Sequence, residues 1–321
     1  MIVTLTAHPS VDQTVALAGS LERGAVLRAL SATSQAGGKG VNISRAAVAA
    51  DVATLAVVPA RLDDPFVAEL AGAGVPVHAV GPAGEIRVNV TITEPDGTTT
   101  KLNSSASPVG DELSAALEEA LHAAAAGAAW VVLAGSLPPG LPARWYADLA
   151  AALRGSGARV AVDTSDEPLR VIGEHLELAA PALLKPNAEE LASLSGADPD
   201  ALESDPAAAA EAAGVLVQRS AGAVLATLGG RGAVLVDGDS AWHATPPPTT
   251  VVSTVGAGDS SLFGYLLGDL QQLPPDQRLA LAVAYGSAAA GLPGTTIPHP
   301  HQVRPELVSV RALHPTEGTV R

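Results

Sequence analysis

The residues with the clearest chemical potential are Gly256, Ala257, Gly258 and Asp259, which follow a short apolar run and open a stretch of helical periodicity. A helix that begins here leaves backbone N–H groups without partners, and the two glycines let a phosphate approach them closely. An aspartate in such a place repels the phosphate, which is explained if Asp259 takes a proton from a hydroxyl that attacks phosphorus. The alternative is an ordinary turn whose aspartate caps the helix, and for an isolated motif this is the commoner case.

A second glycine turn, Gly-Gly-Lys-Gly-Val-Asn at 37–42, also precedes a helical pattern. It is not a P-loop, because Gly40 stands where that motif needs Ser or Thr and the upstream glycine is missing. Lys39, set among glycines at a helix start, nevertheless suits a phosphate group. A flexible turn with a solvated lysine explains the same residues.

Polar side chains in two extended segments suit a sugar or a phosphate. Arg87 and Asn89 lie two apart in an alternating segment, so they point to the same side of a strand. A guanidinium beside an amide can bind a phosphate or sugar hydroxyls. Asp12, just after the first strand, can accept hydrogen bonds from hydroxyls. The alternatives are a solvated sheet face for the pair and a turn residue for Asp12.

Two further segments are candidates for nucleotide contacts. Asn187 and Glu190 stand three apart at a helix start, where they either order a hydrated Mg²⁺ or cap the helix reciprocally. The Thr-Leu-Gly-Gly-Arg-Gly turn at 227–232 serves either a nucleotide or a tight bend. His299 and His301 lack a third ligand nearby, so we expect a surface loop there and no metal site.

Composition limits the classes of function. The 321 residues are 47% hydrophobic but only 2% aromatic, so we expect a core of small and branched aliphatic side chains. A formal charge of −15 opposes binding to nucleic acid or anionic lipid. The absence of cysteine excludes disulfides, thiolate metal sites and cysteine nucleophiles. With no signal peptide or membrane span in the pattern, we expect a cytoplasmic protein.

Short β-branched runs alternate with Ala- and Leu-rich helical patterns along the chain. Strands are expected at 2–7, 53–58, 75–80, 130–134, 158–162, 182–184, 223–227 and 233–236. Helices are expected at 41–50, 64–73, 111–126, 143–153, 188–194, 207–213, 258–270 and 275–291. This alternation predicts a mostly parallel sheet with helices on both faces.

Two segments break the alternation and predict hairpins. The first pairs 14–17 with 26–33, and the second pairs 87–93 with 98–102 around a Glu-Pro-Asp-Gly turn. We interpret them as a small β lid and not as a second full domain. The last residues, 314–321, are expected to fray.

The order of these motifs along the chain is more specific than any one of them. Gly-Gly-Lys-Gly-x-Asn near 40, Lys-Pro-Asn-x-x-Glu near 187, Thr-Leu-Gly-x-x-Gly near 229 and Gly-Ala-Gly-Asp near 259 together resemble the ribokinase-like (PfkB) sugar kinases over nearly the full chain. Arg87-x-Asn89 and Gly-Ser-Leu-Pro-Pro-Gly at 135–140 are similar to the phosphosugar branch, and the overall pattern is most similar to bacterial 1-phosphofructokinases.

The resemblance implies an α/β, ribokinase-like three-layer sandwich that forms a single kinase domain, 1–321. A mostly parallel central sheet would carry a β-sheet lid built from insertions at about 12–34 and 86–104. In relatives the lid also pairs with a second subunit, so a homodimer through the lid is implied. The partners are a phosphosugar and ATP, with Mg²⁺ as a further cofactor and with neither nucleic acid nor membrane.

The resemblance also implies the reaction and the residue roles. ATP would phosphorylate fructose 1-phosphate at its 6-hydroxyl to give fructose 1,6-bisphosphate. The catalytic group would be the base Asp259 with an anion hole from the N–H groups of Gly256, Ala257 and Gly258. The sugar phosphate would be held by Lys39, Arg87 and Asn89, and the sugar hydroxyls by Asp12, Gly38 and Asn42. The nucleotide side would comprise Lys185, Asn187, Glu190, Thr227, Gly229 and Gly232, with Glu190 acting on Mg²⁺ through water.

Other functions are compatible with parts of the pattern. Tagatose 6-phosphate or fructose 6-phosphate can replace fructose 1-phosphate as acceptor, because residues 58–64 depart from the glycine-rich stretch that the family has near the sugar. A non-catalytic phosphosugar-binding protein is a remoter alternative, since Asp259 is retained. A dinucleotide-binding oxidoreductase is excluded because Ser261 replaces the third glycine and no βαβ unit follows.

Overall fold

A computed structural model describes residues 1–105, 107–238 and 240–313 of the chain. The C-terminal stretch 314–321, for which fraying was predicted, lies outside the described residues.

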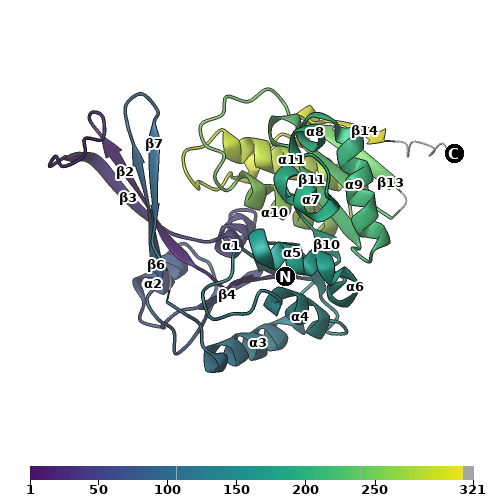
Figure 1. Ribbon diagram of the computed structural model, residues 1–321, viewed down its shortest axis with the longest axis horizontal. Coiled ribbons are helices and arrows are strands. Elements are labelled where there is room, and N and C mark those ends of the chain that lie inside the picture. The colour runs from purple at the N-terminus through teal and green to yellow at the C-terminus, as the bar shows by residue number, and fades with distance from the viewer. Residues whose placement is uncertain (106, 239, 314–321) are drawn as a thin grey trace.

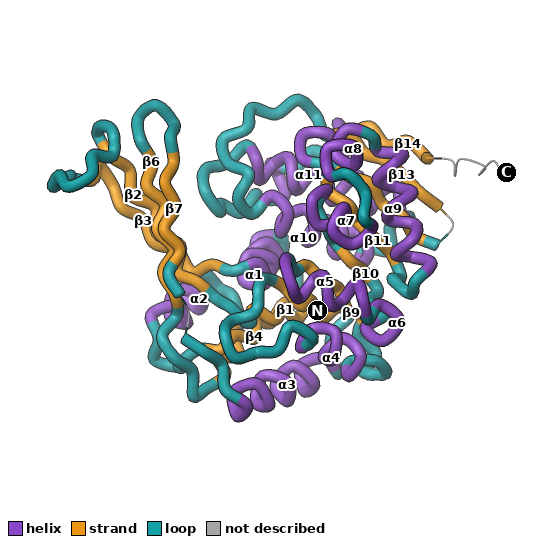
Figure 2. Tube along the Cα trace, in the orientation of Figure 1, coloured by secondary structure: helices purple, strands orange, loops and turns teal. Residues whose placement is uncertain are grey.

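The body of the protein is built on a ten-stranded sheet in the order β14-β13-β12-β11-β10-β9-β8-β1-β4-β5 (Figures 1 and 2). Every neighbouring pair from β11 to β5 is parallel, and the pairs from β11 to β14 are antiparallel. The strands are β1 (Ile2–Thr6), β4 (Thr54–Pro59), β5 (Val77–Val80), β8 (Trp130–Ala134), β9 (Arg159–Asp163), β10 (Leu183–Leu184), β11 (Ala223–Thr227), β12 (Ala233–Asp237), β13 (Ser240–Thr245) and β14 (Ser309–Leu313). The predicted mostly parallel sheet is confirmed, with an antiparallel edge.

Helices cover both faces of this sheet and make the predicted three layers. One layer contains α1 (Lys39–Ala49), α2 (Pro65–Gly72), α10 (Ala257–Leu270) and α11 (Pro275–Ala290). The other contains α3 (Asp111–Ala125), α4 (Trp145–Ala152), α5 (Asp166–Glu174), α6 (Leu176–Ala179), α7 (Ala188–Ser195), α8 (Pro199–Ser204) and α9 (Pro206–Gln218). Strand β8 shows why both layers form: Val131 and Leu133 enter one apolar cluster, whereas Trp130, Val132 and Ala134 enter the other.

Small residues let the helices next to the site pack closely. A Cβ added to Gly264 of α10 would lie 2.6 Å from the carbonyl oxygen of Leu281 in α11. No side chain fits in that space, so the crossing of α10 and α11 requires glycine at 264. Because α10 begins at the Gly256–Asp259 turn, this crossing helps to hold the turn in place.

A separate four-stranded sheet in the order β3-β2-β6-β7 projects from the body, at the left of Figure 1. It consists of β2 (Ser10–Leu17), β3 (Ala29–Gly37), β6 (Arg87–Thr93) and β7 (Thr99–Asn103), and we call it the lid sheet. β2–β3 and β6–β7 are antiparallel hairpins, and β2 pairs with β6 in parallel. The two predicted hairpins therefore form one sheet.

The structure corrects several predicted elements. β2 begins at Ser10, so Asp12 lies within a strand and not in a turn, and β3 starts later than predicted and continues to Gly37. Helix α5 and strands β13 and β14 were not predicted. Pro168 argues against a helix at α5, and the mixed polarity of β13 and β14 weakens the periodicity of these two strands.

No helix among the residues that the structure describes combines the length and the apolar character that crossing a bilayer requires.

Candidate active site

The functional residues gather where the parallel strands end. β1, β8, β9, β10 and β11 all point their carboxyl ends to the same edge of the sheet, and the helix starts of α1, α7 and α10 follow there. In open α/β sheets this edge is where ligands bind. The sequence motifs, which are spread over more than two hundred residues, thus come together because of the parallel topology.

Asp259 lies in the first turn of α10, just after Gly256, whose φ of 78° is in the left-handed region. Its carboxylate is buried, with 6% of the residue exposed, and its Oδ2 accepts a hydrogen bond from Asn42 Nδ2 at 2.8 Å. Burial, reinforced by the charge of Asp163, raises the pKa of Asp259 to about 6, although Lys39, Asn42 and Lys185 oppose the shift. A carboxylate with this pKa is ionised at neutral pH and is a stronger base than an exposed aspartate.

A buried ion cluster lies beside this base. Asp163, at the end of β9, is fully buried and sits between two ammonium groups: its Oδ1 is 2.6 Å from Lys39 Nζ and its Oδ2 is 3.2 Å from Lys185 Nζ. Burial alone would raise the pKa of Asp163, but the charges of Lys185 and Lys39 outweigh it and lower that pKa. Together with Asp259, two carboxylates face two lysines, which balances the buried charge.

Lys39 and Lys185 are held differently in this cluster. Burial opposes the charged form of Lys39, yet Asp163 and Asp259 raise its pKa above the ordinary value, so it is a cation throughout the physiological range. Lys185 is almost completely buried. Its Nζ would be 3.4 Å from a Cβ on Gly258, so it lies against the first turn of α10. The structure therefore places a cation beside the predicted anion hole.

Sequence reasoning missed Asp163. The available signal was a single polar residue directly after the apolar run of β9, at the carboxyl end of a predicted strand. Nothing in its sequence neighbourhood pairs it with Lys39, 124 residues earlier in the chain. Asp163, Lys185 and Lys39 meet only because β9 and β10 are neighbours in the sheet and α1 starts beside their ends.

The Gly37–Asn42 turn packs directly on the end of β1. Gly38 has a φ of 119° and precedes α1, and a Cβ there would lie 2.6 Å from Thr6 Cγ2. Thr6 Oγ1 accepts a hydrogen bond from the Val41 N–H at 3.0 Å, while a Cβ on Gly40 would lie 2.5 Å from that oxygen. The glycines are thus required by this close approach, which directs Asn42 toward Asp259.

The lid sheet brings the predicted sugar-binding residues together. In the β2–β6 pairing, Ser10 lies opposite Arg87 and Asp12 opposite Asn89. Asp12 Oδ1 accepts hydrogen bonds from Asn89 Nδ2 at 3.0 Å and from Ser10 Oγ at 2.9 Å. Asp12 Oδ2 would be 2.3 Å from a Cβ on Gly37, so the carboxylate lies against the Gly37–Asn42 turn.

Several buried polar atoms at this end have no partner among the described residues. Among them are Asn42 Oδ1, Asn89 Oδ1 and Arg87 Nε. Buried polar groups are normally hydrogen-bonded, so unpaired ones of this kind mark a place where a ligand completes the bonds. Burial lowers the pKa of Arg87, an effect that the charge of Asp12 opposes. A bound anion would favour its cationic form.

On the nucleotide side, the structure shows the helix-capping alternative for Asn187 and Glu190. Asn187 Oδ1 accepts from the Glu190 N–H at 2.8 Å, and Glu190 Oε2 accepts from the Asn187 N–H at 2.8 Å. Asn187 also forms a bridge to Thr227 at the end of β11. The capping box begins two residues after Lys185, and the charge of Glu190 contributes to the raised pKa of Lys39.

The 227–232 turn forms the tight bend. Gly229 and Gly232 have φ values of 51° and 93°, and a Cβ on Gly232 would lie 1.9 Å from the carbonyl oxygen of Ala244. These two glycines are explained by backbone geometry. Nucleotide contacts there stay a prediction.

A magnesium ion fits this site only with help from other ligands. Among the described residues no three His, Cys, Asp or Glu side chains form a metal-binding group. Mg²⁺ commonly keeps several waters and binds substrate phosphates with one or two carboxylates. The residues present therefore suit the predicted indirect contact through Glu190 and water.

Comparisons with known proteins point to one family and one fold. A family model described as pfkB family carbohydrate kinase matches residues 7–302. The chain is 37% identical over 324 residues to the 1-phosphofructokinase of Rhodobacter capsulatus, covering 98% of each chain.

Two solved structures of phosphofructokinase-2 from Escherichia coli have the same fold. The one in complex with substrates and products has a TM-score of 0.84 at 29% identity, covering 95% of this chain and 99% of that one. The one in complex with fructose-6-phosphate has a TM-score of 0.81 at 28% identity, covering 92% and 95%.

Proposed function

The chain belongs to the pfkB family of carbohydrate kinases, and from this premise we propose that it transfers a phosphoryl group from ATP to the 6-hydroxyl of fructose 1-phosphate. The product is fructose 1,6-bisphosphate. The observation that carries the proposal is the buried Asp259 carboxylate, whose pKa is raised and which lies at the start of α10 beside two lysines. The similarity to 1-phosphofructokinases supports the choice of acceptor.

In the proposed reaction, Asp259 takes the proton of the acceptor hydroxyl as the oxygen bonds to the γ-phosphorus of ATP. The bond from that phosphorus to the bridging oxygen breaks, and ADP leaves with the bond's electron pair. Asn42 holds Asp259 in place through the 2.8 Å hydrogen bond. Phosphoryl transfer depends chiefly on alignment and charge stabilisation, so a fixed base and nearby cations are what it needs.

The anion hole is proposed at the first turn of α10. The N–H groups of Gly256, Ala257 and Gly258 would face the transferring group, where the helix dipole adds a partial positive charge. The Ala257 N–H already donates to the Thr254 carbonyl at 3.3 Å, a long bond, so we assign the larger share to Gly258. Lys185, which lies against Gly258, would offset the charge of the phosphoryl group.

The phosphate that the sugar already carries is assigned to Arg87 and Asn89. Both have a buried polar atom without a partner among the described residues, which a phosphate would satisfy. Lys39 donates to Asp163, and because an ammonium group has three N–H donors it can also contact this phosphate. Asp12, Gly38 and Asn42 are proposed to contact the sugar hydroxyls.

ATP and Mg²⁺ are proposed on the side of Asn187 and Thr227. Kinases of this family generally use both, and a bound Mg²⁺ would neutralise charge on the phosphates of ATP. The capping box fixes Glu190 near the ion cluster, where it would act on the metal through water. Lys185, Gly229 and Gly232 are proposed to line the nucleotide.

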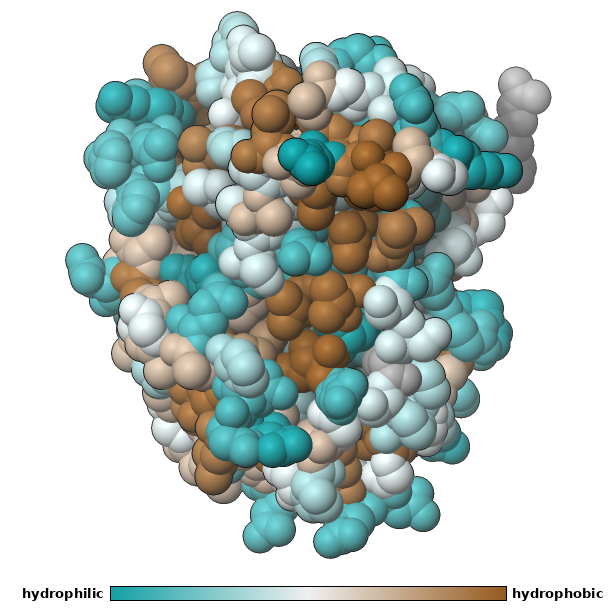
Figure 3. Space-filling view, turned by 90° about the vertical axis from the view of Figure 1, so that its left-hand side faces the viewer, coloured by the Kyte–Doolittle hydropathy of each residue, from teal (hydrophilic) through white to brown (hydrophobic). Residues whose placement is uncertain are grey.

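The lid sheet is proposed to join two copies of this single-domain chain. Figure 3 faces the side of the molecule that carries the lid sheet and shows brown apolar areas on it. Large apolar residues in or between the lid strands are exposed: Leu21, Val26, Leu27, Leu30, Val88 and Leu102. Such a concentration on a projecting sheet is typical of an interface.

The proposal is tested by measuring ADP release with fructose 1-phosphate, tagatose 6-phosphate, fructose 6-phosphate and fructose. We expect the highest kcat/KM with fructose 1-phosphate and the lowest with fructose, which has no phosphate for Arg87. The likeness to phosphofructokinase-2 bound to fructose-6-phosphate makes fructose 6-phosphate the second candidate. A preference for unphosphorylated fructose would contradict the proposal.

A further inference from the structure

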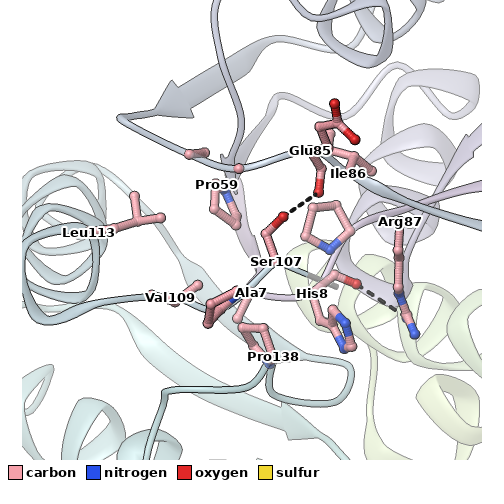
Figure 4. A pocket seen from close by; sticks show the side chains of 14 residues that line it. Ala7, His8, Pro59, Glu85, Ile86, Arg87, Ser107, Val109, Leu113 and Pro138 are labelled. Carbon is pink, nitrogen blue, oxygen red and sulfur yellow. Dashed lines mark hydrogen bonds between the residues drawn. The ribbon is translucent and has the colours of Figure 1, made fainter. Parts of the chain in front are cut away.

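A small hollow adjoins Arg87 at the base of the lid sheet (Figure 4). It lies where β1 ends, β6 begins and the 135–140 loop passes. Its lining includes His8, Pro59, Glu85, Arg87, Ser107 and Pro138. His8 has no part in the predicted site or in the proposed reaction.

The His8 ring has one satisfied and one unsatisfied nitrogen. Its Nδ1 is 2.9 Å from Ser136 Oγ, whereas its Nε2 is buried and has no partner among the described residues. Arg87 Nη2 reaches the His8 carbonyl oxygen over a long 3.4 Å contact, so the guanidinium lies next to this residue. Arg87 Nε is likewise buried without a partner.

The Ser136 hydroxyl can donate to Nδ1 or accept from it, so the neutral ring has two possible tautomers. If Ser136 accepts from Nδ1, Nε2 is an acceptor. If Ser136 instead donates its hydroxyl proton to Nδ1, the hydrogen of the neutral ring is on Nε2. His8 and Arg87 then both offer an N–H that lacks an acceptor. Two such donors on adjoining residues suit an anion such as a phosphate.

The ring is neutral at physiological pH. Burial, and next to it the charge of Arg87, lowers the pKa of His8 to about 4. A neutral imidazole offers a single N–H, so the hydrogen bond to Ser136 decides where the ring donates.

We propose that His8 is a substrate-binding residue whose Nε2 donates to the phosphate of the phosphosugar beside Arg87, with Ser136 fixing the ring tautomer. This assignment rests on the proposed function. It makes His8 a determinant of specificity for a phosphorylated over an unphosphorylated sugar, because an unphosphorylated sugar leaves both donors unpaired.

The test compares His8→Ala, His8→Gln and Ser136→Ala with the wild type and with His122→Ala, an exposed histidine on α3 as control. We expect His8→Ala to raise the KM for fructose 1-phosphate on the order of 10-fold, with the KM for ATP unchanged. Inorganic phosphate, used as a competitor, should lose inhibitory strength by a similar factor. His8→Gln, whose amide N–H can replace Nε2–H, should recover part of the loss, and Ser136→Ala should show a smaller rise.

Melting temperatures of all variants show whether each one folds. A His8→Ala variant that folds and keeps the wild-type KM overturns the assignment, as does a raised KM with unchanged inhibition by inorganic phosphate. A wild type that phosphorylates none of the three hexose phosphates overturns the proposed function itself.

Discussion

The sheet edge around Asp259 and the lid sheet around Arg87 differ in how their charged side chains are held. At the sheet edge the charges are buried and paired, as in the Lys39–Asp163–Lys185 cluster and the Asn42–Asp259 hydrogen bond. In the lid sheet Arg87 and Asn89 keep buried atoms without partners. A preorganised region can hold a base in its reacting geometry before substrate arrives. A region with unpaired groups gains its missing bonds only from a ligand.

The largest effect is expected at the preorganised edge, from Asp259→Asn. The amide cannot take the proton of the acceptor hydroxyl, so kcat should fall on the order of 10²–10⁴-fold. ATP binding, measured by titration calorimetry, should persist because the nucleotide residues are untouched. Turnover close to that of the wild type would contradict the assignment of Asp259 as the base.

Asp163→Asn tests whether the ion cluster holds the fold and tunes the base. Removing one carboxylate leaves the buried Lys185 ammonium and the partly exposed Lys39 ammonium opposed only by Asp259, which should cost about 3 kcal/mol of unfolding free energy. The control is Asp148→Asn, which breaks the exposed ion pair with Arg144 and should change the unfolding free energy by less than about 1 kcal/mol. Denaturant unfolding measures both, and equal losses would argue against a structural role for the cluster.

The same Asp163 variant should shift the pH profile. In the wild type kcat/KM should fall below a pH of about 6, where Asp259 takes up its proton. Because the charge of Asp163 raises the pKa of Asp259, its removal should move this acid limb to lower pH. A limb that stays in place, or moves to higher pH, would show that Asp163 does not act on the base.

A smaller effect is expected in the lid sheet from Arg87→Ala. Loss of a charged hydrogen bond should raise the KM for the phosphosugar roughly 10–100-fold, with little change in kcat or stability. Arg144→Ala, an exposed arginine on the body, should leave the KM unchanged. An unchanged KM for Arg87→Ala would rule out the proposed role of Arg87 in binding the phosphate of the sugar.

The smallest effect on stability is expected at the exposed side of the lid sheet. Leu30 is 71% exposed in the single chain, so Leu30→Glu should change the unfolding free energy of a monomer by about 0.5 kcal/mol or less. It should nevertheless separate a dimer joined through the lid, as light scattering would show. The matched control is Leu62→Glu, because Leu62 is also a highly exposed leucine but lies outside the lid sheet. An unaffected dimer would place the interface elsewhere.

Much of this molecule was predictable because its signals are local. The apolar runs of β8 and β11 were predicted to the residue, since a buried strand needs nothing beyond its own composition. The glycine turns before α1 and α10 were likewise predicted, and Gly38 and Gly256 have the positive φ that favours glycine. Strands β13 and β14 were missed because their sequences mix polar and apolar residues, and β14 is positioned by its pairing with β13.

The sequence by itself determined the strand–helix alternation, the motifs and the kinase family, because each follows from short runs of residues and from the order of those runs along the chain. Only the tertiary structure placed Asp163 between Lys39 and Lys185 and joined Asn42 to Asp259, 217 residues away. The tertiary structure also raises the pKa of Asp259, because burial and neighbouring charge arise only when distant segments pack together. The identity of the base was local information, whereas its strength as a base was set by the fold.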